Sequence, residues 1–227
     1  MLTTILTLIL APVAAIAAHW FYKSRLDAFS AQPLWQSFFV GILVIIPVAI
    51  LDLVARDMGF TASGDVTVKM SYAIAIGFTK EWLKYLFLLW FIAQHPAFDE
   101  PYKGIAYALM MAFGFAAAEN VIDSLFFNKM QLMSPFLSLP VYTLSAILMG
   151  YGLGQSKNFG TIWLAEIKGL LLAFAFHAAC LFSVVCQFDS LLQLSAVTAL
   201  VFTLSKIFKA TKIRQRTLAF QAYARNV

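Results

Sequence analysis

The sequence has few charged residues and almost no cysteine. Charged residues make up 12% of its 227 residues and hydrophobic residues 62%, whereas a soluble domain carries about 25% charged and about 45–50% apolar residues. This scarcity of charge excludes an ordinary soluble protein and indicates an integral membrane protein, with a length that suits one helical bundle. The two cysteines, Cys180 and Cys186, lie in one apolar run and match no metal-binding or disulfide pattern. We expect both to be free thiols.

A basic surface for nucleic acid is also lacking, although the formal net charge is +5. Six of the 16 Lys and Arg residues fall in the last 22 positions, beside the final apolar run. Such clustering is typical of a cytoplasmic tail that lies on an anionic membrane leaflet. We therefore expect the lipid bilayer as a partner and exclude nucleic acid.

Long apolar runs dominate what the sequence does contain, and each run of about 20 residues predicts a transmembrane helix. The sequence has seven such runs, at residues 3–21, 34–55, 70–93, 104–127, 136–154, 162–186 and 189–208. They do not alternate in polarity and are too long for barrel strands. The first run lacks the basic region of a signal peptide, so we expect an uncleaved helix.

We therefore predict an all-α fold, a polytopic membrane helix bundle with about seven transmembrane helices. Residues 1–208 are expected to form one integral-membrane domain, and residues 209–227 a basic cytoplasmic tail. The basic residues of the loops divide unequally between the two sides. If the C-terminus is cytoplasmic, only three of these basic residues lie on the extracytoplasmic side: Arg56, Lys69 and Lys129. The larger set then lies with the tail: Lys23, Arg25, Lys103 and Lys157. The positive-inside rule predicts that the N-terminus is out and the C-terminus in.

Several of the apolar runs carry polar side chains that hydrocarbon should exclude. These residues are Lys80, Glu81, Lys84, Glu119, Asn120, Asp123, Tyr142 and His177. Each charge near the bilayer centre costs about 2.5–3.5 kcal/mol even on the lenient insertion scale. Such groups persist when they face the bundle interior, a cavity or one another.

The depths of these residues converge. Glu119 and His177 each lie about 15 residues, roughly 22 Å, from the cytoplasmic starts of their helices. Tyr142 lies roughly 9 Å from the outer start of its helix, which is nearly the same level. Glu81 lies one to two turns deeper and can pair with Lys84, three residues on, whereas Lys80 points about 100° away. The pattern predicts one shared polar site in the outer half of the membrane. A purely structural ion pair, a packed Tyr142 and a hydrogen-bonded core His177 are the alternatives.

One of these runs resembles the signature helix of the PrsW family of intramembrane proteases. The run is FDEPYKGIAYALMMAFGFAAAENVI, residues 98–122, with an acidic-Pro loop followed by a Gly-rich helix that closes on Glu-Asn. The order of motifs along residues 10–185 is similar as well. The resemblance implies membership of the wider superfamily of prenyl-protein (CAAX) proteases and bacteriocin-immunity proteins, and a place in the bacterial cytoplasmic (inner) membrane.

The family's motifs can be carried over residue by residue. Its Glu-Glu-x-x-Lys motif falls on residues 80–84, where Lys80 replaces the first glutamate. Its Glu-Asn motif is intact as Glu119 and Asn120. A family histidine falls on Tyr142, and the last histidine is His177, with Leu181 where an acidic residue is common.

The resemblance implies an intramembrane endopeptidase with a substrate such as an anti-sigma factor. The outer-half depth of the site predicts that it cleaves a single-pass membrane protein near the extracytoplasmic side. We expect a water held between Glu81 or Glu119 and His177, with Glu81 as the base, kept ionised by Lys84. Asn120 and His177 would stabilise the oxyanion, and Tyr142 would support the site. No cofactor is favoured. The alternative is a divalent metal such as zinc, held by Glu81, Glu119 and His177.

Two other classes of function are compatible with the same residues. One is a catalytically impaired pseudoprotease or membrane scaffold that binds transmembrane helices, which the departures at Lys80, Tyr142 and Leu181 favour. The other is a small transporter or proton-relay protein, since buried Glu, Lys and His also build such pathways. The sequence has no evident inverted repeat, which disfavours the transporter.

Overall fold

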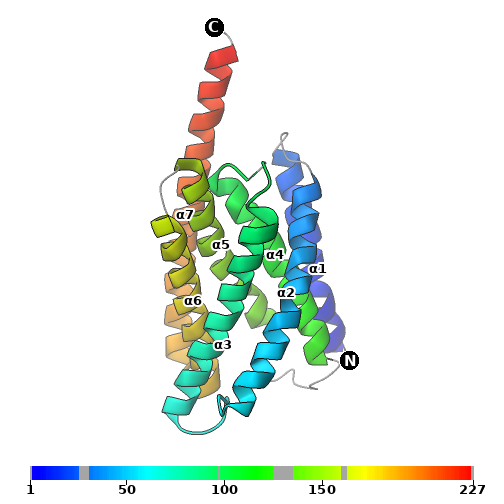
Figure 1. Cartoon of the computed structure of the whole chain (residues 1–227), viewed down its shortest axis with the longest axis vertical. Helices are drawn as coiled ribbons and strands as arrows, with labels where there is room; N and C mark the ends of the chain where they lie inside the picture. Colours follow the sequence, from blue (N-terminus) through cyan, green and yellow to red (C-terminus); the bar gives the residue numbers. More distant parts are fainter. Residues whose placement is uncertain (1, 26–30, 97, 125–134, 160–162, 226–227) are drawn as a thin grey trace.

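The protein is a bundle of antiparallel helices. The computed structural model describes residues 2–25, 31–96, 98–124, 135–159 and 163–225. These residues form seven α-helices and one short π-helix, and no strand is present among them. The helices are α1 (Leu2–Arg25), α2 (Ala31–Asp57), α3 (Val66–Phe87), η1 (Leu88–Ile92), α4 (Pro101–Ile122), α5 (Pro135–Phe159), α6 (Trp163–Cys186) and α7 (Asp189–Arg225). Successive α-helices run in opposite directions, and the chain ends lie at opposite ends of the bundle (Figure 1). The predicted all-α membrane bundle is confirmed.

Among the residues that the structure describes, five helices are long and apolar enough to cross a membrane. Their spans are Gln32–Asp57, Pro101–Ile122, Leu137–Lys157, Trp163–Cys186 and Asp189–Phe220. The helix α3 is not among them, because Lys80, Glu81 and Lys84 break up its apolar character. The helix α1 contributes a shorter apolar stretch, Leu8–Lys23. Both lie antiparallel within the same bundle, α1 against α4 and α3 against α6.

The helix α4 is the centre of the bundle and packs against α1, α2 and α5. Small residues allow the backbones to touch, as is common between membrane helices. A Cβ atom at Gly114 would overlap the carbonyl oxygen of Phe38, and one at Gly41 would overlap the carbonyl oxygen of Met111. The α2–α4 contact is therefore a contact between backbones, and it fixes the height of Glu119 relative to the other helices.

The helix α3 owes its position to its cap and to a close contact with α6. Asp65 caps its first turn by accepting a hydrogen bond from the backbone amide of Val68 (2.9 Å). A Cβ atom at Gly77 would lie 3.2 Å from the Cα of Ala178. Because α3 can approach α6 this closely, Glu81, one turn beyond Gly77, reaches the residue that precedes Ala178, His177.

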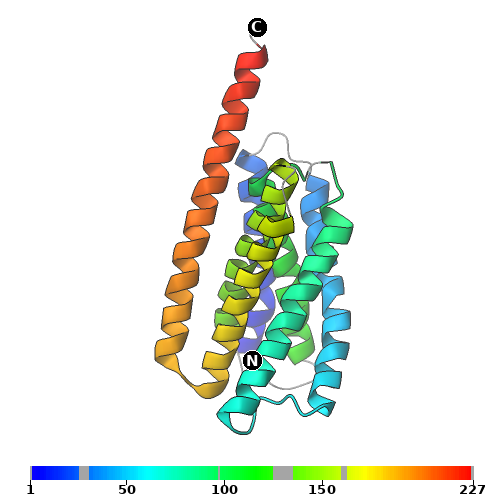
Figure 2. The same cartoon turned by 60° about the vertical axis from the view of Figure 1, so that its left-hand side comes forward.

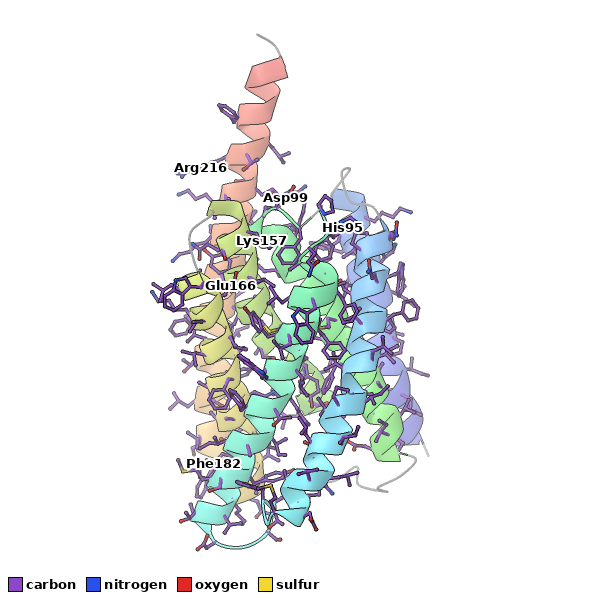
Figure 3. The ribbon with its side chains drawn as sticks, viewed as in Figure 1. His95, Asp99, Lys157, Glu166, Phe182 and Arg216 are labelled. Carbon is purple, nitrogen blue, oxygen red and sulfur yellow. The ribbon has the colours of Figure 1, made fainter. Side chains whose placement is uncertain are left out.

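The helix α7 is longer than the apolar run predicts and rises beyond the other helices (Figure 2). It continues through residue 208 to Arg225 without a break, so the predicted boundary at 208 is not a helix end. Arg214 joins it to the start of α4 by an ion pair with Glu100 (2.6 Å). Lys157 and Arg216 lie at this end of the bundle (Figure 3). The division into a membrane domain and a cytoplasmic tail, and the orientation in the membrane, remain predictions.

The cysteines and the end of the fourth apolar run are the two remaining features to compare with the sequence-based expectations. Both cysteines are free thiols, Cys180 buried and Cys186 partly buried, as predicted. The predicted end of the fourth run at 127 and the loop residue Lys129 lie outside the described residues.

Candidate active site

A carboxylate in the core of the bundle gathers three polar partners. The Oε1 atom of Glu81 on α3 lies 2.6 Å from the Nζ of Lys84 and 2.6 Å from the Nδ1 of His177 on α6. The hydroxyl of Ser145 on α5 donates a third hydrogen bond to the same atom (3.1 Å). Glu81 is 0% exposed, and Lys84 and His177 are each 1% exposed. We call Glu81, Lys84, Ser145 and His177 the inner network.

A second network surrounds the other carboxylate. The Nζ of Lys80 on α3 lies 2.5 Å from the Oε1 of Glu119 on α4. The hydroxyl of Tyr142 on α5 donates to the other carboxylate oxygen of Glu119, and Lys80 lies 3.5 Å from that hydroxyl. The side chains of Lys80 and Glu119 are 12% and 14% exposed. We call Lys80, Glu119 and Tyr142 the outer network.

The ring of Tyr142 separates the two networks and contacts both. It lies 4.9 Å from the Nζ of Lys84, within the range of a cation–π interaction. Its centroid is 5.3 Å from that of the His177 ring. Each network pairs one lysine with one glutamate, so each buried charge is offset by a neighbouring opposite charge, which burial requires.

The helical period explains how neighbouring residues serve different networks. Glu81 and Lys84 lie on one face of α3, three residues apart, as predicted. Lys80 precedes Glu81 directly, so its side chain points about 100° away from that of Glu81. It reaches Glu119 instead. On α5, Tyr142 and Ser145 are also three residues apart, but they serve different networks, because Tyr142 reaches Glu119 and Ser145 reaches Glu81.

A cavity of about 470 Å³ opens between α2 and α4 beside the outer network. Its polar lining residues are Asp52, Arg56, Glu119 and Asp123, and its other lining residues are apolar. The Oδ1 atom of Asp52 is buried there and has no hydrogen-bond partner among the described residues. Glu119 therefore faces a cavity, whereas Glu81 and His177 do not line it.

The structure brings most of the predicted site residues together but divides them into two groups. Glu81, Lys84 and His177 are in direct contact, and Glu119 and Tyr142 form the adjoining group. Asn120 is buried in the same turn of α4 as Glu119, and its part in the site remains a prediction.

Two residues of this region, Asp52 and Ser145, were not predicted as site residues from the sequence. Asp52 is a lone carboxylate within the second apolar run, and such a residue is itself a signal of a polar site. Ser145 carries no such signal, because serine is common in membrane helices.

The predicted metal ligands do not fit a metal centre in this arrangement. No group of three or more His, Cys, Asp or Glu side chains that suits a metal ion is present among the described residues. Lys80 and Tyr142 occupy the two oxygens of Glu119, and Glu81 and His177 face each other through Oε1 and Nδ1. The Oε2 atom of Glu81 and the Nε2 atom of His177 are buried and have no hydrogen-bond partner in the part of the chain that the structure describes. These two atoms alone are fewer than the three protein ligands of a catalytic zinc site.

Comparisons with known proteins agree with the motif pattern. The family described as "PrsW family intramembrane metalloprotease" matches residues 30–207. "Protease PrsW" of Geobacillus kaustophilus is 30% identical over 152 residues, which cover 65% of this chain and 64% of that protein. "Protease PrsW" of Bacillus subtilis is 26% identical over 149 residues, covering 65% and 66%. "Protease PrsW" of Oceanobacillus iheyensis is 27% identical over 177 residues, covering 75% and 76%.

The chain thus spans about two thirds of the length of the first two relatives. No solved structure matches it. The relatives are bacterial and the helices suit a membrane, so the protein is an integral protein of the bacterial inner membrane. Because the family match covers more than half of the sequence, the chain belongs to the PrsW family of intramembrane proteases.

Proposed function

We propose that this protein is an intramembrane endopeptidase that cleaves single-pass membrane proteins near the extracytoplasmic side. The observation that carries the proposal is the Glu81 carboxylate, held by Lys84, Ser145 and His177 in the apolar core of a PrsW-family bundle. Buried ion pairs are often no more stabilising than apolar packing. Their retention in the core of a membrane bundle therefore supports a chemical role.

The geometry of the inner network favours His177 as the general base. Its Nδ1 faces the Glu81 carboxylate at 2.6 Å, so Nδ1 carries the proton and Nε2 has a free lone pair. Glu81 then orients the ring and stabilises the imidazolium, which is the part of the carboxylate in other hydrolytic dyads and triads. This assignment differs from the one made on the sequence, in which Glu81 was the base.

The proposed reaction is a water-mediated hydrolysis of the peptide bond. Nε2 of His177 takes a proton from water while the water oxygen bonds to the carbonyl carbon, giving a tetrahedral intermediate with an oxyanion. The imidazolium then gives that proton to the amide nitrogen as the C–N bond breaks. The ammonium of Lys80 and the hydroxyl of Tyr142 lie beside the dyad and are suited to stabilise the oxyanion.

The outer network is suited to binding the substrate. Glu119 lines the cavity between α2 and α4, which gives an extended substrate segment a lateral path from the lipid. Glu119 lies three residues before the end of α4 and His177 nine residues before the end of α6. At about 1.5 Å per residue, both lie in the half of the bundle that the charge pattern assigns to the outside. An anti-sigma factor as substrate, and placement in the wider CAAX-protease superfamily, rest on the family resemblance.

A second candidate function is a pseudoprotease or scaffold that binds transmembrane helices. Lys80 neutralises Glu119 at 2.5 Å, where the family pattern has a second glutamate in place of the lysine. The inner network is also sealed, with Glu81 at 0% and His177 at 1% exposure. Both observations favour binding without cleavage.

Reconstituted cleavage separates the two functions. The protein is placed in liposomes with a set of single-pass reporter proteins, and new peptide termini are identified by mass spectrometry. We expect cleavage by the wild type and a loss of about 10²–10⁴-fold in His177→Ala, with large losses in Glu81→Gln and smaller ones in Glu119→Gln.

The matched control is Tyr85→Phe, which removes a part-buried hydrogen bond between α3 and α6, to Glu166 (2.8 Å), outside both networks. This variant is expected to retain activity. A parallel reaction with a chelator tests metal dependence, and full activity is expected there. Cleavage that survives in folded His177→Ala and Glu81→Gln would contradict the proposed site, and reporter binding without cleavage would favour the scaffold.

A further inference from the structure

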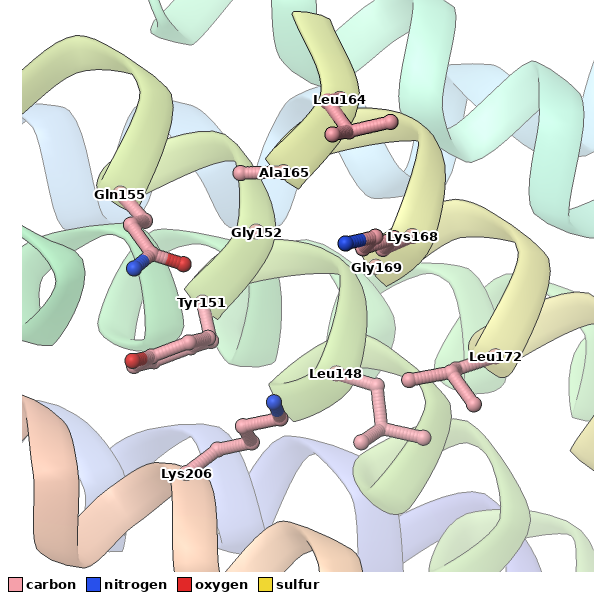
Figure 4. Close-up of a pocket in the computed structure, with 10 residues that line it drawn as sticks. All are labelled: Leu148, Tyr151, Gly152, Gln155, Leu164, Ala165, Lys168, Gly169, Leu172 and Lys206. Atoms are coloured by element: carbon pink, nitrogen blue, oxygen red, sulfur yellow. The ribbon is translucent and has the colours of Figure 1, made fainter. Parts of the chain in front are cut away.

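A second pocket lies near the other end of α5 and α6, far from Tyr142 and His177 along both helices. It has a volume of about 250 Å³ and is lined by residues of α5, α6 and α7 (Figure 4). Lys168 of α6 and Lys206 of α7 contribute their ammonium groups, and Tyr151 and Gln155 of α5 contribute neutral polar groups. We call it the lysine pocket.

The charge of the lysine pocket is not compensated. Its described lining residues include no Asp or Glu, and neither Lys168 nor Lys206 forms an ion pair with any carboxylate that the structure describes. Lys206 instead lies over the ring of Tyr151, 5.1 Å from the centroid. The nearby carboxylate Glu166 accepts a hydrogen bond from Tyr85 of α3. Two cations that converge without an acidic partner favour an anionic ligand.

The floor of the pocket is backbone. A Cβ atom at Gly152 of α5 would lie 3.1 Å from the Cα of Gly169 on α6. The two helices therefore touch at these glycines, and Lys206 of α7 borders the same space. Lys168 and Lys206 thus reach the same space from different helices (Figure 4).

An apolar groove continues from the lysine pocket along α7. It has a volume of about 320 Å³ and shares Leu148 and Leu172 with the lysine pocket. Its other lining residues come from α6 and α7, among them Phe176, Leu194 and Phe202, and none of them is charged. A charged pocket that opens into an apolar groove matches the two parts of a phospholipid.

We propose that the lysine pocket and its groove bind one anionic phospholipid. The phosphate lies between the ammonium groups of Lys168 and Lys206, and an acyl chain follows the groove between α6 and α7. Basic pockets between transmembrane helices bind anionic head groups by this chemistry. The adjoining groove is what favours a lipid over free phosphate, because inorganic phosphate would leave the apolar surface unused.

Lipid binding to the purified full-length protein tests the proposal. The protein is kept in a neutral detergent, and bound lipid is counted by native mass spectrometry. We expect one phosphatidylglycerol to be retained in preference to phosphatidylcholine with the same acyl chains. Lys168→Gln and Lys206→Gln should each weaken binding about fivefold, and the double variant about 25-fold.

The matched control is the double variant Lys209→Gln/Lys212→Gln, which removes two exposed lysines from the same helix outside the pocket. It should bind phosphatidylglycerol like the wild type. Lys168→Arg/Lys206→Arg keeps both charges and should keep most of the binding, which shows that a loss in the Gln variants does not reflect misfolding.

Two further arms distinguish the lipid from other anions. Thr198→Phe, which adds bulk to the wall of the groove, should weaken binding of long-chain phosphatidylglycerol and leave a short-chain analogue unaffected. Inorganic phosphate at millimolar concentration should not raise the unfolding temperature. Equal retention of phosphatidylcholine, an equal loss in the Lys209/Lys212 control, or equal protection by phosphate would each overturn the proposal.

Discussion

Lys80 and Lys84 stand one helical turn apart on α3, and each neutralises a glutamate, yet their surroundings differ. The inner network around Glu81 and Lys84 is sealed from the outside, with 0% and 1% exposure. The outer network around Lys80 and Glu119 is 12–14% exposed and borders a cavity. The sealed network holds a histidine with a free lone pair, and the open one holds only donors and a neutralised carboxylate. In the proposed function the inner network therefore supplies the general base, and the outer network binds the substrate and, through Lys80 and Tyr142, stabilises the oxyanion.

The largest effect on stability is expected for Glu81→Leu. This change leaves Lys84 charged and without its partner in the core, which costs about 3–5 kcal/mol for a buried pair. The double variant Glu81→Leu/Lys84→Met removes both charges and should recover most of that loss. Unfolding in mixed micelles, followed by circular dichroism, measures both variants. If the single and double variants lose the same free energy of unfolding, the unpaired charge of Lys84 is not the cause of the destabilisation.

Lys80→Glu is expected to lower the free energy of unfolding by a smaller amount, about 2–3 kcal/mol. The effect is smaller because the Lys80–Glu119 pair is partly exposed. The change also restores the family's Glu-Glu-x-x-Lys pattern and places two carboxylates together. The variant should gain stabilisation by Zn²⁺ or Mn²⁺ that the wild type lacks, since Glu119 is no longer occupied by an ammonium. Unfolding temperatures with and without each metal provide the readout. An equal metal response in wild type and variant would show that Lys80 does not block a metal site.

Tyr142→Phe separates the hydroxyl of this residue from its ring. The ring still lies beside Lys84 and His177, but Glu119 loses a hydrogen-bond donor. A hydrogen bond to a charged group contributes about 1.5–3 kcal/mol, and the partial exposure of Glu119 favours the lower end. Chemical unfolding provides the measurement, with Tyr151→Phe as a control that removes a tyrosine hydroxyl elsewhere on α5. A loss as large as that of Glu81→Leu would mean that the two networks are one.

The smallest effect is expected for Ser145→Ala. Glu81 keeps Lys84 and His177 as partners, so the loss should be about 0.5–1.5 kcal/mol. The same unfolding assay serves here, with Ser138→Ala on the same helix as the control. A loss of more than about 3 kcal/mol in the free energy of unfolding would mean that Ser145 stabilises the Glu81 carboxylate more than one neutral hydrogen bond explains.

The sequence was informative wherever local periodicity decides the structure. The i,i+3 spacing predicted the Glu81–Lys84 pair, and the apolar runs predicted the helices. The common depth of Glu119, Tyr142 and His177 predicted that they would meet, because helix rise converts position into height.

What the sequence did not provide depends on how the helices face one another. The Lys80–Glu119 pair joins residues 39 positions apart. It depends on how α2, which packs against both α3 and α4, positions these two helices, and no local pattern encodes that arrangement. The split of the carboxylates into two networks follows from that same packing. The continuation of α7 past residue 208 was missed because hydropathy marks where apolar character ends, whereas a polar sequence can remain helical.

The most direct test of the division between the two networks is steady-state cleavage of one reporter by four proteins in liposomes: wild type, His177→Ala, Glu119→Gln and Tyr85→Phe. We expect His177→Ala to lower kcat by at least about 10²-fold with little change in KM. Glu119→Gln should act mainly by raising KM, and Tyr85→Phe should match the wild type. Undiminished kcat in folded His177→Ala would show that His177 is not the general base.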